Sequence, residues 1–89
     1  MKIRKHIVFR GEVQGVGFRY RARYAADRNG CTGWVHNEWD GSVTMEIQGE
    51  ESDIDRVLVE IDSGHFIRIE SMETKRLAIV EDERSFRSV

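Results

Sequence analysis

The sequence predicts an α+β fold in which two helices pack on one face of an antiparallel sheet. Three observations predict this: stretches where apolar residues alternate, two stretches where they recur with helical spacing, and glycine or polar turn residues between them. The 89 residues, 39% hydrophobic and 34% charged, are enough for one hydrophobic core and too few for two. We therefore expect residues 1–89 to form one domain.

The first strand is predicted over residues 3–9, because alternate apolar residues there share one face. These residues are Ile3, Ile7 and Phe9. The segment GEVQGVG follows, and its glycines at 11, 15 and 17 can adopt backbone angles that are closed to other residues. We expect a tight loop between this strand and the next element.

The first helix is predicted to begin at Phe18, where the apolar spacing changes to the helical period. The residues that would share its buried side are Phe18, Ala22, Ala25 and Ala26. Asn29 and Gly30 form the stop signal expected after a helix.

A hairpin is predicted next, with strands at Gly33–Asn37 and Ser42–Gln48 around a turn that contains Asp40 and Gly41. Its second strand alternates most clearly, since Val43, Met45 and Ile47 would point to one face.

The second helix has the strongest pattern in the chain. Ser52 is a suitable capping residue, and Asp53 and Asp55 suit the positive N-terminal end of a helix. Apolar residues recur at helical spacing at Ile54, Val57, Leu58 and Ile61. Gly64 is expected to end the helix.

The last third of the chain returns to strand character from Phe66 to about Lys75. Ile67 and Ile69 share a face while Met72 falls on the other, which indicates a bulge or an early end. Glu81–Glu83 is expected to be a loop, and residues 85–89 a short edge strand. The resulting order, βαββαβ, is that of a ferredoxin-like sandwich.

The charge is distributed unevenly along the chain. Residues 1–28 hold eight Lys or Arg and two acidic residues, whereas the remainder holds six basic and fourteen acidic residues. The basic end is therefore the predicted anion binder, and the acidic remainder opposes binding of a polyanion such as a nucleic acid. A small anionic ligand fits this balance best.

The first turn of the first helix carries Arg19 and Arg21, although the positive end of a helix favours acidic residues. A bound anion would compensate for this. Backbone amides of Gly15, Val16, Gly17 and Phe18 are the predicted phosphate-binding groups, because glycine-rich turns before helices present their amides to anions. Arginine also suits phosphate, since its planar fork donates two parallel hydrogen bonds.

The segments GEVQGVGFR at 11–19, GWVHN at 33–37 and DGSV at 40–43 resemble the two signature regions of the acylphosphatase family. The resemblance runs through the whole chain. It implies the ferredoxin-like fold and hydrolysis of acyl phosphates without a metal or cofactor. It also implies that Arg19 grips the phosphate and Asn37 places the attacking water. The chain departs from the family at Glu12 and His36, where a basic residue is common.

Two other functions remain open on the sequence. A non-catalytic module could use the same loop to sense phosphate or dock a partner. Single-stranded nucleic acid could bind the sheet face, as in RNA-recognition domains of this topology, but the strands lack the required glycine-and-aromatic signature. We expect a small acyl phosphate as substrate, inorganic phosphate as product, and neither a nucleic acid nor a membrane as partner.

The remaining residues with reactive or large side chains are expected to be structural. His6, His36 and His65 are scattered without a triad or metal spacing, Cys31 is expected to be a small buried or semi-exposed residue, and Phe18 and Trp34 are expected in the core. The acidic runs at 50–55 and 81–83 are expected to be solvated. Since no long apolar run follows the basic start, we expect a cytoplasmic protein. We expect a monomer, because nothing in the sequence requires a second chain.

Overall fold

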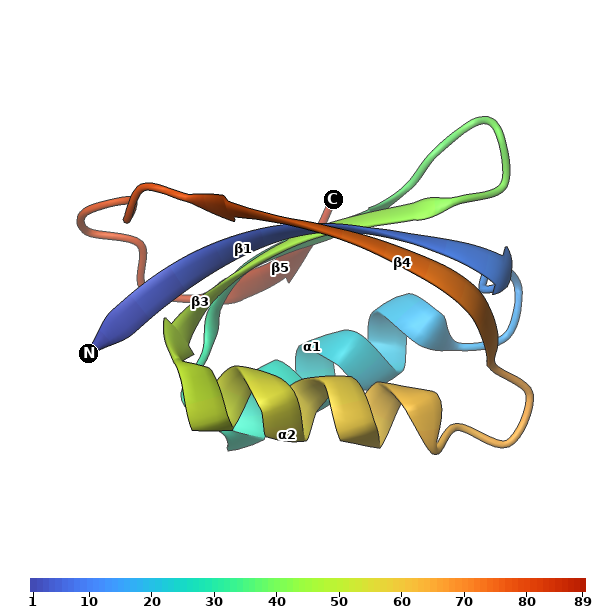
Figure 1. Ribbon diagram of the computed structural model, residues 1–89. Helices are drawn as coiled ribbons and strands as arrows, with labels where there is room; N and C mark the ends of the chain where they lie inside the picture. The colour runs from blue at the N-terminus through green and yellow to red at the C-terminus, as the bar shows by residue number, and fades with distance from the viewer.

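The computed structural model describes all residues, 1–89, and contains five strands and two helices. In chain order they are β1 (Lys2–Glu12), α1 (Phe18–Arg28), β2 (Thr32–Asn37), β3 (Val43–Glu50), α2 (Glu51–Asp62), β4 (Arg68–Leu77) and β5 (Phe86–Ser88). Both helices cover the same face of the sheet (Figure 1). The predicted βαββαβ order is confirmed.

The strands lie in the order β4-β1-β3-β2-β5. All pairs are antiparallel except the edge pair of β2 and β5, which is parallel, so the sheet is mixed. The predicted edge strand near the C-terminus is thus confirmed as β5.

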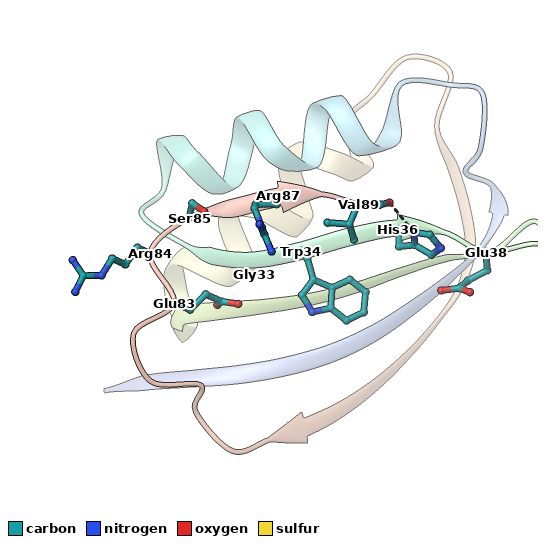
Figure 2. Close-up of a pocket in the computed structure, with 9 residues that line it drawn as sticks. All are labelled: Gly33, Trp34, His36, Glu38, Glu83, Arg84, Ser85, Arg87 and Val89. Atoms are coloured by element: carbon teal, nitrogen blue, oxygen red, sulfur yellow. Dashed lines mark hydrogen bonds between the residues drawn. The ribbon is translucent and has the colours of Figure 1, made fainter.

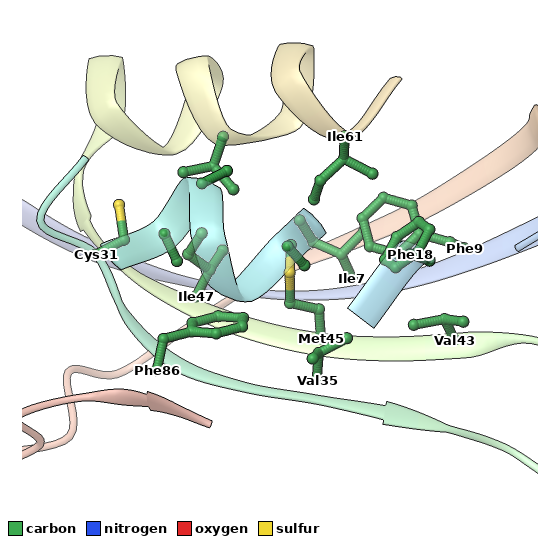
Figure 3. Close-up of a cluster of buried hydrophobic side chains, with 14 of the residues drawn as sticks. Ile7, Phe9, Phe18, Cys31, Val35, Val43, Met45, Ile47, Ile61 and Phe86 are labelled. Atoms are coloured by element: carbon green, nitrogen blue, oxygen red, sulfur yellow. The ribbon is translucent and has the colours of Figure 1, made fainter. Parts of the chain in front are cut away.

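The core fills the space between the sheet and the helices (Figure 3). Alternate residues of β1 and β3 enter it, as their period-two patterns predict. Phe9 of β1 packs edge-on against Phe18 of α1, with ring centroids 4.8 Å apart. This contact anchors the first turn of α1 to the sheet and so fixes the loop between them.

The predicted bulge lies in β4, opposite the end of β1. Arg10 pairs with Ser71 and Gly11 with Ile69, so Glu70 has no partner residue in β1. Gly11 has φ +130°, and a Cβ there would lie 2.3 Å from the Arg68 carbonyl oxygen. Only glycine therefore allows the two backbones to approach this closely.

The start of α2 differs from the prediction. The N-terminal capping position is Glu50, at the end of β3, and no side chain caps the helix. Ser52 lies inside the first turn, so its predicted capping role is wrong. The strand runs directly into the helix, and Asp53 in the first turn supplies the favourable negative charge.

The open face of the sheet carries a buried ion-pair cluster. Arg4, 2% exposed, donates from Nε to Glu46 Oε1 at 3.0 Å and from Nη1 to Glu83 Oε1 at 2.8 Å. Burial alone would lower the pKa of Arg4, but the hydrogen bonds to Glu83 and Glu46 outweigh it and the pKa is raised. Glu83 is thus partly buried rather than solvated, and it fastens the loop between β4 and β5 to the sheet.

Trp34 also lies on this open face. It is half-buried and edge-on to His6, with ring centroids 6.4 Å apart, while its neighbour Val35 lies in the core. The prediction of a core position for Trp34 is therefore wrong, because the alternation of β2 assigns that face to its neighbours. Neither α1 nor α2 is both long and apolar enough to span a membrane.

Candidate active site

The loop between β1 and α1 leaves backbone amides without partners. Gly17, with φ +82°, holds the N-terminal capping position of α1, and the helix begins with the bond from Arg21 N to Gly17 O at 3.0 Å. No side chain caps this end and its first turn contains no acidic residue. The first amides of α1 thus have no intrahelical acceptor, which is the usual setting of a helix-terminal anion site.

Gly15 has φ +71° and, like Gly17, adopts the left-handed conformation. A Cβ at either glycine would meet nothing within 4 Å. The loop therefore needs glycine for its backbone angles and not for space.

Arg19 stands exposed in the first turn of α1, and its guanidinium makes no hydrogen bond or ion pair with the protein. It lines a cavity of about 180 Å³ together with Gly15, Gly17, Phe18 and Asn37. An unpaired guanidinium and the positive end of a helix dipole thus border one small space, and both favour an anion in it.

Asn37 is the last residue of β2 and pairs with Val43 of β3. Its side-chain oxygen Oδ1 is buried without a hydrogen-bond partner. Leaving a buried acceptor unpaired costs about 1–3 kcal/mol. The amide oxygen beside the cavity is therefore available to accept a hydrogen bond from a bound molecule.

Gln14 connects the loop to the β2–β3 turn. Its Nε2 donates to the Glu38 carbonyl at 2.7 Å and to the Ser42 carbonyl at 2.9 Å. Glu38 follows Asn37 directly, so these bonds hold the strand end that carries Asn37 against the glycine loop. The sequence analysis missed Gln14, although a polar residue between buried Val13 and the loop glycines is a signal for such a contact.

The turn itself is braced by Asp40. Its Oδ1 accepts hydrogen bonds from Ser42 Oγ at 2.6 Å and Ser42 N at 3.0 Å, and its Oδ2 accepts one from Arg10 at 3.3 Å. The Ser42 hydrogen bonds, followed by Arg10, hold the pKa of Asp40 below its ordinary value. The carboxylate therefore stays ionised and maintains the turn.

The predicted phosphate-binding residues do not all border the cavity. Gly15, Gly17 and Phe18 line it, whereas Val16 lines a neighbouring groove and packs on the core. Val16 can therefore contribute to phosphate binding only through its backbone amide, and not through its side chain. Glu12 does not line the cavity, and its Oε1 lies 3.9 Å from Arg68 Nη1, so its carboxylate points away from the site.

His36 lies on the opposite face of β2 from Asn37, as the alternation predicts. Its Nδ1 donates to the Val89 carbonyl at 2.7 Å (Figure 2). Figure 2 also shows the hollow that His36 lines with Trp34 and Arg87, a space of about 550 Å³ on the open face of the sheet. This hollow is larger than the Arg19 cavity, but it contains neither the loop glycines nor Asn37.

The Arg19 cavity has no Asp, Glu, His, Cys or Lys among its lining residues, and its titratable side chains are Arg19 and Tyr20. Cys31 is buried elsewhere, and burial raises the pKa of its thiol to about 11, so it remains a neutral thiol near pH 7. No three His, Cys, Asp or Glu side chains are grouped so as to hold a metal ion. The site thus offers hydrogen-bond donors and positive charge, together with one amide acceptor.

A ferredoxin-like sandwich with such a cavity has the features expected of a small protein that acts on phosphoryl groups by positioning and charge stabilisation. The acylphosphatase family model matches residues 5–88. The acylphosphatase of Oceanobacillus iheyensis is 51% identical over 71 residues, which cover 78% of each chain. That of Geobacillus thermodenitrificans is 41% identical over 85 residues, covering 94% of this chain and 90% of the relative.

A solved structure agrees with the sequence relatives. The crystal structure of acylphosphatase from Bacillus subtilis superposes with a TM-score of 0.89 at 30% identity and covers 98% of both chains. The chain therefore belongs to the acylphosphatase family, and the resemblance inferred from its motifs is confirmed. The family's activity is hydrolysis of the carboxyl–phosphate bond of acyl phosphates.

Proposed function

We propose that Arg19 and Asn37 are the catalytic residues with which this chain hydrolyses acyl phosphates to a carboxylate and inorganic phosphate. The observation that carries the proposal is the common cavity of these two side chains, one an unpaired cation and the other an unpaired buried acceptor. A cation and the free amides of the α1 terminus suit the phosphoryl oxygens. The unpaired amide oxygen suits a water molecule.

The phosphoryl group is held by the backbone amides from Gly15 to Phe18 and by the Arg19 guanidinium. These donors neutralise the negative charge that spreads over the equatorial oxygens in the transition state. Their positions are fixed in advance by the left-handed glycines and by the contact of Phe18 with Phe9. Little reorganisation is thus needed when the substrate binds.

The attacking water is oriented by Asn37, whose Oδ1 accepts one of its hydrogen bonds. The water oxygen forms a bond to phosphorus while the bond from phosphorus to the carboxyl oxygen breaks, and the water proton passes to an oxygen of the substrate's own phosphate. The leaving carboxylate is weakly basic and departs without a proton. The reaction therefore needs no general acid, in agreement with the side chains that border the cavity.

The test is turnover of acetyl phosphate by the wild-type chain in the presence of a chelator, with phosphate release as the readout. Hydrolysis that is retained with chelator and lost in Arg19→Ala would support the proposal. Equal rates for wild type and Arg19→Ala would refute it. Binding of inorganic phosphate without turnover would instead identify the non-catalytic phosphate-binding module, which the family membership does not favour.

The proposed working form is a cytoplasmic monomer that needs no nucleic acid, membrane or cofactor. The single cysteine, Cys31, is buried as a free thiol, in keeping with a reducing compartment. Every group assigned to the reaction comes from one chain. Sedimentation equilibrium across a range of concentrations tests the monomer, and cell fractionation tests the location.

A further inference from the structure

A groove of about 480 Å³ adjoins the Arg19 cavity, between α1 and the loop that follows α2. It shares Gly17 and Tyr20 with the cavity but does not include Asn37. The loop before α1 and the loop after α2 lie at the same end of the molecule (Figure 1). A molecule whose phosphate occupied the cavity could therefore extend into the groove.

The groove has aromatic walls. Tyr20 is 76% exposed and Phe66 is 71% exposed, and both line it. Tyr24 lies 6.3 Å from Tyr20 between ring centroids and continues the same wall. Single apolar residues on a surface are ordinary, but these rings gather beside one small cavity, which is typical of a binding surface.

The two arginines that line the groove are already paired. Arg21 Nη1 donates to the Glu60 carbonyl at 3.2 Å, and Arg28 Nη2 donates to Glu60 Oε1. Arg28 also lies over the Tyr24 ring, with its guanidinium carbon 5.2 Å from the ring centroid. Of the other polar groups, Glu60 Oε2 is buried without a partner, and the His65 ring lies edge-on to Phe66 with centroids 4.7 Å apart. The exposed rings of the groove therefore suit a flat aromatic group.

In-line displacement determines which part of the substrate lies here. The attacking and leaving oxygens occupy opposite sides of the phosphorus. The water is assigned to Asn37, so the acyl group departs on a side away from Asn37. The groove meets the cavity at Gly17 and Tyr20, and Asn37 does not line it. It is therefore the adjoining space into which the acyl group can extend.

We propose that this groove is the acyl subsite of the enzyme and that Tyr20 and Phe66 select acyl phosphates with an aromatic acyl group. The inference rests on the proposed function, since it assumes that the phosphate lies in the Arg19 cavity. An aromatic acyl group stacks against the two rings. The acetyl group has no ring to stack against Phe66.

The experiment compares benzoyl phosphate with acetyl phosphate as substrates of the wild type and of Phe66→Ala. Phe66 is a sharper probe than Tyr20, because it lines the groove but not the cavity and its side chain is mostly exposed. We expect kcat/KM for benzoyl phosphate to fall roughly fivefold, the size of one aromatic contact, and that for acetyl phosphate to change less than about twofold. Phe66→Tyr, which keeps the ring, should retain the wild-type ratio.

Trp39→Ala is the matched control, since Trp39 is aromatic, 97% exposed, and lines neither the groove nor the cavity. It should leave both substrates unchanged. An unaltered ratio of the two substrates in Phe66→Ala, or an equal loss for both, overturns the acyl subsite while the proposed function stands. Absence of wild-type turnover on either substrate overturns the proposed function itself.

Discussion

Arg4 and Arg19 show two opposite uses of the same side chain. Arg4 is 2% exposed and bonded to Glu46, Gln48 and Glu83. Arg19 is exposed, has no partner in the protein, and borders a cavity. Where a guanidinium stabilises the fold, the chain supplies its acceptors. Where it serves the reaction, as we propose for Arg19, the acceptors are left for the substrate.

Substitution of Arg19 by alanine should have the largest effect. We expect kcat to fall about 10²- to 10³-fold, the range for loss of one preorganised donor to the transition state, or about 3–4 kcal/mol. Because Arg19 has no partner to lose, the free energy of unfolding should stay within about 0.5 kcal/mol of wild type. Steady-state kinetics and urea unfolding measure the two quantities. The matched control is Arg23→Ala, an exposed arginine of the same helix that borders no part of the cavity.

Substitution of Asn37 by alanine should separate turnover from phosphate binding. We expect kcat to fall about 10²-fold, since the water loses its acceptor. The inhibition constant of inorganic phosphate should change little, because the loop amides and Arg19 remain. Competitive inhibition by phosphate provides the second readout. A parallel loss of phosphate affinity and turnover would contradict the role assigned to Asn37.

Substitution of Arg4 by alanine should produce the reverse pattern. It leaves the Glu46 and Glu83 carboxylates without their cation, so we expect the free energy of unfolding to fall by about 3 kcal/mol. The kcat of the folded fraction should be retained, since Arg4 lies outside the cavity. Urea unfolding checks this, with Arg56→Ala as the control, because its pair with Asp53 is solvent-exposed and worth under about 1 kcal/mol. A large loss of kcat in Arg4→Ala would break the contrast between the two arginines.

Local patterns were sufficient to predict the elements that these contrasts depend on. The alternation at Ile3, Ile7 and Phe9 and the helical spacing from Phe18 placed β1 and α1 correctly, because each pattern extends over a few residues. The bulge in β4 was visible as a change of face between Ile69 and Met72. The glycine loop also indicated the candidate site, which stays a prediction, because left-handed glycines before a helix leave amides free.

Contacts between distant residues were not predictable in the same way. Glu83 meets Arg4 across 79 positions of the chain, and Gln14 meets Ser42 across 28. No local pattern encodes such pairs, so Glu83 was assigned to solvent and Gln14 was overlooked. The wrong prediction of a cap at Ser52 has a different cause. Strand β3 continues directly into α2, so the helix begins at Glu51 and Ser52 lies inside its first turn.

Gln14 sharpens the comparison, because its structural contact predicts an effect on catalysis. Gln14→Ala removes both bonds to the β2–β3 turn, so Asn37 should lose its fixed position and kcat should fall roughly tenfold, or about 1.4 kcal/mol. Gln14→Glu, which keeps the size and loses the donor, should behave similarly. The decisive measurement is a double-mutant cycle. If Gln14 acts through Asn37, Gln14→Ala should have little further effect on kcat in the Asn37→Ala background.

The smallest expected effect concerns the pH dependence of stability at the Arg4 cluster. Burial would raise the pKa of Glu46, but hydrogen bonds from His6 and Arg4 outweigh it, and the pKa lies below its ordinary value of 4.5. A carboxylate with a lowered pKa stabilises the fold above its unfolded pKa, and this stabilisation is lost as the pH falls through the folded pKa. Wild type should therefore lose stability as the pH drops below about 4.5, and Glu46→Gln should lose less over the same range. Urea unfolding midpoints at pH 7 and pH 3.5 measure this, and equal pH slopes for the two proteins would show that the cluster's acceptors do not act as charges.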